Sequence, residues 1–171
     1  MRAALFAAVL TVGVLVIALA TRAALAGQAR NWLHYTFRGV PARPETAVGI
    51  FANNTRELLG VLGLLLIAQL AARRAGGPTR TQLLLRSCGE LILIGAIGAN
   101  VLVVGAAVGG YGTRMVRAML PHGPVEVAAY ALVLALYLLG RSRPLPTARL
   151  AGAIATSVAL LAVAALLETF A

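Results

Sequence analysis

Apolar residues gather in five long blocks along the chain, and short polar stretches separate them. The blocks cover residues 3–26, 50–72, 91–110, 124–139 and 148–171. Because a helix needs about 20 residues to cross the hydrocarbon core of a bilayer, each block predicts a membrane-spanning helix. We therefore expect an all-α fold, a polytopic membrane helical bundle of five transmembrane helices that forms one integral membrane domain over residues 1–171.

The first block has two interpretations. Arg2, the apolar run and the small residues Ala24-Leu25-Ala26 fit a secretory signal with a cleavage site. The same block is interrupted only by Thr11, Thr21 and Arg22, and its length suits a membrane span. We interpret it as the first span.

Residues 28–44 have a different texture, because aromatic and basic side chains alternate there. The residues concerned are Arg30, Trp32, His34, Tyr35, Phe37 and Arg38. This mixture is typical of a segment that lies at the bilayer interface. The alternative is a docking helix for a partner protein. His34 has no acidic or cysteine neighbour in sequence, so we do not interpret it as a metal ligand.

Composition supports a membrane protein. Apolar residues make up 60% of the chain and charged residues 12%, whereas soluble domains carry about 25% charged residues. The net charge of +10 comes from 15 arginines, no lysine and five glutamates. These arginines lie in the gaps between the apolar blocks, so the lipid bilayer is the expected partner and nucleic acid is not. Cys88 is the single cysteine, which excludes a disulfide within the chain.

The orientation in the membrane is weakly encoded. Five spans place the two termini on opposite sides, and an inside N-terminus leaves eight arginines inside and seven outside. The short basic loops after the second and fourth spans favour an N-terminus inside the cell.

Polar residues inside the blocks are costly in lipid and therefore need partners. Residues 47–57 form a polar turn that should extend the second span, and Asn53 and Glu57 within it are four residues apart on one helical face. We expect six polar residues from three segments to converge in one buried cluster: Asn53, Asn54, Glu57, Asn100, His122 and Glu126.

The third block carries a glycine pair with GxxxG spacing, Gly105 and Gly109. Small residues at this spacing let two membrane helices approach closely, so we expect a helix-packing face here.

The fourth block begins with a motif that combines helix-start signals and ionisable groups. Pro121 should break the preceding connector, Gly123 gives the backbone freedom, and Pro124 suits a first helical position. His122 and Glu126 have helical spacing and can meet on one face. The pair is either a structural clamp between helices or a site that handles protons or substrate, and the spacing leaves both open.

Between about Ile50 and Gly140 the chain resembles the stage II sporulation protein M family of bacterial membrane proteins. The matching positions are Phe51 with Asn53-Asn54, Asn100 with Gly105, Pro121-His122-Gly123 with Glu126, then Ala128 or Ala129 and Gly140. One departure is the valine after Asn100, where the family has glycine. The resemblance implies a non-enzymatic, multi-pass protein of the bacterial inner membrane.

Two branches of that family imply different roles. In one branch the protein is a membrane scaffold for cell-wall (peptidoglycan) remodelling enzymes during sporulation. In the other it is encoded beside transporter ATPases for peptide or bacteriocin export and self-immunity. We therefore expect a partner subunit, either an ATPase or a cell-wall enzyme complex, and a second copy of the chain is a further candidate partner.

An intramembrane enzyme built on His122 and Glu126 is a third hypothesis with little support. The chain has no HExxH pair, no aspartate and no lysine, so it also lacks a GxxxxGK nucleotide loop. We expect no catalytic residues, no cofactor and no metal ion, and any ATP-driven step should come from another chain.

Overall fold

The computed structural model describes residues 2–37, 41–73 and 77–171, and every regular element in these ranges is a helix. In chain order they are α1 (Arg2–Ala20), the π-helical turn η1 (Thr21–Leu25), α2 (Ala26–Leu33), α3 (Pro44–Ala72), α4 (Arg80–Tyr111), α5 (Thr113–Met119), α6 (Gly123–Gly140) and α7 (Thr147–Phe170). Within these ranges five helices are long and apolar enough to cross a membrane: the helical stretch Ala3–Leu33, α3, α4, α6 and α7. The predicted helical class and the number of candidate spans are thus confirmed.

Two helices start earlier than their apolar blocks. The second begins at Pro44 rather than near residue 50. Proline lacks an N–H group, but the first helical turn makes no hydrogen bond with that group, so a helix can start there; the polar turn 47–57 then continues it. The third begins at Arg80, after Thr79 caps it. The Thr79 hydroxyl accepts from the Gln82 N–H and the Gln82 side chain accepts from the Thr79 N–H, a reciprocal capping box.

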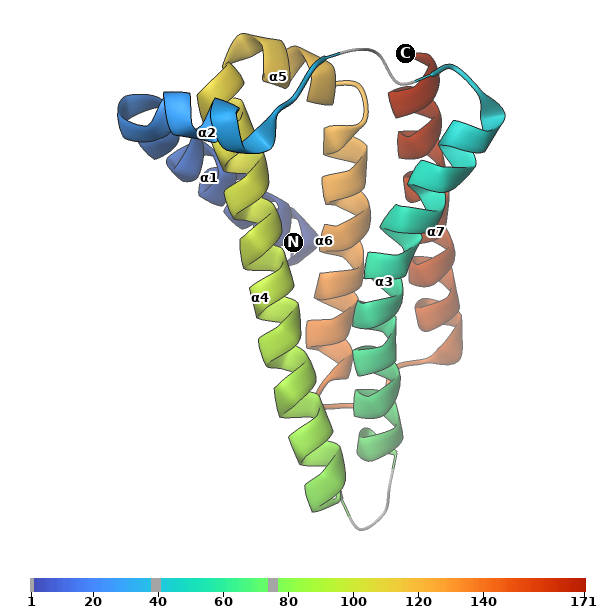
Figure 1. Ribbon diagram of the computed structural model, residues 1–171. Coiled ribbons are helices and arrows are strands. Elements are labelled where there is room, and N and C mark those ends of the chain that lie inside the picture. Colours follow the sequence, from blue (N-terminus) through green and yellow to red (C-terminus); the bar gives the residue numbers. More distant parts are fainter. Residues whose placement is uncertain (1, 38–40, 74–76) are drawn as a thin grey trace.

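The segment expected at the interface is partly helical. The first helix does not stop at residue 26 but turns at η1 and continues as α2 to Leu33, with buried Thr21 at the turn. Such π-helical turns redirect a helix, and α2 accordingly lies across one end of the bundle (Figure 1). Arg38 of the predicted segment lies outside the described residues.

The bundle has two distinct ends. We call the end that carries α2, α5 and the C-terminus the α5 end, and the opposite end, where α3 is followed by α4, the α3–α4 end (Figure 1). Contacts between α3 and α6 follow the same order along both helices, so these two run in the same direction, and α1 and α4 do likewise. α6 lies at the centre, packed against α1, α3 and α7.

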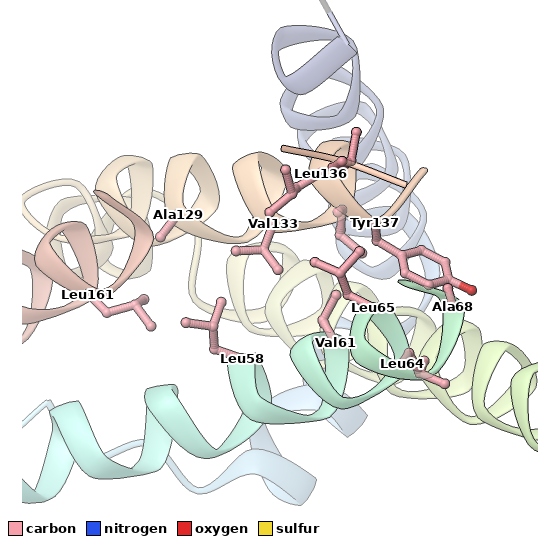
Figure 2. Close-up of a cluster of buried hydrophobic side chains, with 12 residues drawn as sticks. Leu58, Val61, Leu64, Leu65, Ala68, Ala129, Val133, Leu136, Tyr137 and Leu161 are labelled. Carbon is pink, nitrogen blue, oxygen red and sulfur yellow. The ribbon is translucent and has the colours of Figure 1, made fainter. Parts of the chain in front are cut away.

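The core lies between α3, α6 and α7. On α3 the buried residues Leu58, Val61 and Leu65 recur at helical spacing and form one apolar stripe. They meet Val133 of α6 and Leu161 of α7, which are fully buried (Figure 2). This three-helix core holds the polar residues at both ends of α6 in place.

Candidate functional site

The start of α6 is built by the motif that the sequence singled out. The carbonyl oxygen of His122 accepts from the backbone N–H groups of Val125 and Glu126, at 3.0 and 3.1 Å, so His122 caps the helix. Pro124 occupies the first turn, where its missing N–H leaves no helical hydrogen bond unmade. Glu126 consequently lies in the first turn, where the helix dipole favours a negative charge.

Of the other two motif residues, Pro121 directly follows the end of α5, as predicted, and Gly123 contributes less than expected. Pro121 is exposed in the turn between α5 and α6. Gly123 does not adopt a positive φ, and a Cβ atom there would lie 3.8 Å from the Met119 Cβ, an ordinary contact. The expectation that Gly123 supplies special backbone freedom is therefore wrong, since an alanine would fit the same geometry.

Asn54 and Glu126 meet across the α3–α6 interface. The Asn54 Nδ2 donates to Glu126 Oε1 at 2.5 Å, and one turn further along α6 the Tyr130 hydroxyl donates to the Asn54 carbonyl oxygen at 3.1 Å. These half-buried groups lie above the fully buried Leu58 and Ala129. We call Asn54, Glu126 and Tyr130 the α3–α6 polar node.

Two further carboxyl groups flank this node. Glu57 of α3 and Glu168 of α7 lie close enough to Glu126 to act on it electrostatically, and Glu57 also lies beside the Tyr130 hydroxyl. Within the described ranges the two ion pairs both involve Glu90, so these acids have no arginine at ion-pair distance there. Three helices thus bring negative groups to the α5 end of a chain with a net charge of +10.

The single buried cluster expected from the sequence does not form. Asn54 and Glu126 come together, but Asn53 and Glu57 are exposed on α3. Asn100 is exposed as well, and its Nδ2 donates at 3.2 Å to the Ala96 carbonyl oxygen of its own helix. The reason is that α4 packs on α1 through a different face. Asn100 lies about 140° and 180° around the helix from Gly105 and Gly109.

His122 also departs from its expected role. Its Nδ1 is buried and has no hydrogen-bond partner among the described residues, so the predicted side-chain pair with Glu126 is wrong. The carboxylate turns toward Asn54 instead. Because His122 serves as the cap, its backbone rather than its ring contacts Glu126.

The glycine pair of α4 lies directly against α1. A Cβ atom on Gly105 would fall 2.6 Å from the Ile17 Cβ, and one on Gly109 would fall 2.5 Å from the Ala18 carbonyl oxygen. Only glycine fits at such distances from a neighbouring backbone. These two residues therefore set how closely α4 approaches the first helix.

Sequence reasoning missed a buried amide at the other end of α6. The Gln69 Nε2 donates to the carbonyl oxygens of Gly140 and Arg143 at 2.6 and 3.0 Å, and its Oε1 accepts from the Leu145 N–H at 2.8 Å. Gln69 is the one strongly polar side chain between Leu58 and Ala72, a signal that could have identified it. It ties α3 to the loop between α6 and α7.

The interactions of Glu90 on α4 were also not predicted from the sequence. The Tyr137 hydroxyl donates to Glu90 Oε1, and the guanidinium groups of Arg86 and Arg141 lie 3.4 and 3.7 Å from the same oxygen. Arg86 and Glu90 are four residues apart, the spacing of a helical ion pair. The charge pattern could have predicted this pair, although not its partners on α6.

Aromatic side chains of the predicted interfacial segment gather at the α5 end. The Tyr111 hydroxyl accepts from the Tyr35 N–H at 2.9 Å and donates to the Arg30 carbonyl oxygen at 3.2 Å. The ring of Phe37 contacts the ring of Tyr111. The Arg114 guanidinium lies over the Phe37 ring, 4.4 Å from the centroid of that ring. These contacts join the end of α4 and α5 to the chain that follows α2.

The α3–α6 polar node links two helices by hydrogen bonds and has further carboxyl groups beside it. In the described part of the chain, no group of three or more His, Cys, Asp or Glu side chains could hold a metal ion. The node offers hydrogen-bond acceptors and negative charge beside a capped helix start. No family model matches the chain, and the searches of curated proteins and of solved structures give no match either.

Proposed function

We propose that this protein is a multi-pass subunit of a multiprotein complex in a bacterial inner membrane. The apolar exterior of the bundle supports insertion. Large apolar side chains such as Leu15, Leu91 and Ile92 point outward along the candidate spans, where a soluble protein would carry polar groups. The proposal includes no catalytic activity of its own.

The observation that carries a role as a subunit is the exposed Asn100. It lies in the middle of the apolar stretch 91–110, and among the described residues its side chain has only a carbonyl of its own helix as partner. A carboxamide facing lipid loses hydrogen bonds, whereas one facing a neighbouring helix gains roughly 0.5–2 kcal/mol.

The process that the complex serves follows from the resemblance to the stage II sporulation protein M family. The preferred hypothesis is a transporter-like membrane component in peptide or bacteriocin export or self-immunity. Because the chain has no lysine, the ATPase of such a system would be a separate chain. The second reading is a membrane scaffold for cell-wall remodelling enzymes.

The hydrogen bonds of the α3–α6 polar node support a clamp in this proposal. The Asn54 side chain of α3 donates to Glu126, and the Tyr130 hydroxyl of α6 donates to the Asn54 carbonyl oxygen, so both hydrogen bonds join α3 to α6 as a structural contact would. The clamp would hold α3 and α6 in register while α4 faces the partner.

Purification from native membranes tests the proposal. Tagged protein extracted in mild detergent should bring down a partner, and Asn100→Leu should reduce its yield several-fold. A transporter ATPase among the bound proteins would support export, a wall hydrolase would support scaffolding, and an untagged copy of the same chain would identify a homo-oligomer.

Leu102→Ala is the matched control. Leu102 is exposed on the same helix, about 200° around from Asn100, and should leave the partner yield unchanged. Wild-type protein that purifies alone, or an Asn100→Leu variant that keeps its full complement of partner, would contradict the proposal.

A further inference from the structure

A groove of about 290 Å³ runs between α1, α4 and α6. Its apolar walls include Phe6 and Leu10 of α1, Leu93 and Ile97 of α4, and Leu134 and Leu138 of α6. From Glu90 to Ile97 the groove follows α4 for seven residues, which is about 10 Å. It is therefore a mainly apolar slot, about two helical turns in length, on the side of the bundle.

One end of this groove is polar. Glu90, Tyr137 and Arg141 line it, and Arg86 pairs with the same carboxylate. Two guanidinium groups share one carboxylate there, so the net charge of these three groups is positive. We call this end of the groove its mouth. The Arg141 side chain is 42% exposed and a guanidinium has five N–H donors, which leaves donors free for a ligand.

The surroundings of the mouth reinforce its positive charge. The described arginines of the α3–α4 end outnumber its acids six to one. They are Arg73, Arg80, Arg86, Arg141, Arg143 and Arg149, against Glu90. The remaining four glutamates, Glu45, Glu57, Glu126 and Glu168, belong to the segments at the α5 end. The groove thus opens at the end where an anionic group is most favoured.

We propose that this groove binds an anionic phospholipid, with one acyl chain along the apolar slot and the phosphate at Arg141. The proposal rests on the membrane location proposed above. An acyl chain gains little by leaving bulk lipid for an apolar slot, because both surroundings are apolar. Selectivity therefore comes from the headgroup, through charge-assisted hydrogen bonds of the kind that arginine makes with phosphate. Basic pockets between membrane helices bind anionic headgroups in this way.

Fluorescence quenching by brominated lipids tests the site. The single natural tryptophan, Trp32, is replaced by phenylalanine, and Leu93→Trp places a reporter in the groove. Ile92→Trp, on an exposed neighbouring position outside the groove lining, serves as the matched reporter for ordinary surrounding lipid. The full-length protein is reconstituted in mixed phosphatidylglycerol–phosphatidylcholine vesicles with bromine on one lipid or the other.

The groove reporter should prefer phosphatidylglycerol by about fivefold, because one arginine near an anionic lipid contributes about 1 kcal/mol. The Ile92→Trp reporter should show no preference. Adding Arg141→Gln should abolish the preference of the groove reporter, whereas Arg143→Gln, in the same basic loop, should preserve it.

Equal quenching by the two lipids at the Leu93→Trp reporter would overturn the lipid site and leave the membrane subunit standing. A preference that survives Arg141→Gln, or that appears equally at Ile92→Trp, would also overturn it. Protein that fails to float with the vesicles would instead overturn the membrane location, and the lipid site with it.

Discussion

Two side-chain amides on α3 hold the same neighbouring helix at its two ends. Asn54 binds Glu126 near the α5 end, and Gln69 binds the carbonyl of Gly140 near the α3–α4 end. The contacts are 15 residues apart on α3 and 14 apart on α6, or about 22 and 21 Å. Because hydrophobic burial is non-directional and hydrogen bonds need a defined geometry, these two contacts help to fix the register of the parallel pair.

At the residue scale, Glu126→Gln and Glu126→Ala should differ. Glutamine keeps an acceptor oxygen for the Asn54 Nδ2, so its thermal stability in detergent should stay close to wild type. Alanine leaves the amide unpaired, which costs about 1–3 kcal/mol. Melting curves and membrane abundance would measure both variants.

Glu45→Ala is the control for this comparison, because Glu45 is exposed on the same helix, nine residues before Asn54, and makes no hydrogen bond to the node. A glutamine variant that is folded and abundant but inactive in export or resistance would contradict the clamp and show that Glu126 titrates. A glutamine variant as depleted as the alanine variant would show that the charge itself is needed.

At the scale of elements, the contact between the first helix and α4 depends on small residues. The backbone of Ala18 and the side chain of Thr21 occupy the space that a Cβ atom on Gly109 would need. Gly98 lies on the same side of α4, about 20° around the helix from Gly109 and about three turns earlier, and a Cβ atom there would meet no described atom within 4 Å. One side of α4 is therefore closed by packing near Gly109 and open nearer the start of the helix, at Gly98.

Gly109→Ala and Gly98→Ala should consequently have opposite effects. Alanine at position 109 would overpack the contact and lower the free energy of unfolding by about 1–3 kcal/mol. Alanine at position 98 should be neutral or slightly stabilising, because alanine favours helix by up to about 1 kcal/mol over glycine. Thermal melts of the two purified variants would test this, and equal melting temperatures would contradict the α1–α4 contact.

How far the sequence predicted these elements depends on the range of the interaction. Hydrophobic blocks predicted the candidate spans because membrane helices are local features. The GxxxG spacing predicted a packing face, but α1 as its partner could not be predicted, since all five blocks present similar apolar surfaces. Asn100 was misplaced for the same reason, because its helical face is decided by which helix α4 meets.

At the scale of the whole molecule, the two ends of the bundle differ in charge. The α3–α4 end carries six described arginines and one glutamate, while the other four glutamates lie toward the α5 end. Counting arginines in the sequence could not predict this difference in charge, because the arginines divide almost evenly between the two sides. The difference arises from where the glutamates lie. The α3–α4 end, which is the more basic, carries the short arginine-rich loops that favour the inside of the cell.

Thiol accessibility in intact cells tests the five-span bundle most directly. In a Cys88→Ser background, single cysteines replace the exposed residues Thr36 and Arg117 at the α5 end and Arg73 and Ser142 at the α3–α4 end. An impermeant maleimide should label Thr36→Cys and Arg117→Cys in intact cells, and the other two only after permeabilisation. Reversed labelling would contradict the orientation alone. If all four label from one side, or if the two positions at one end label from opposite sides, the five-span arrangement is wrong.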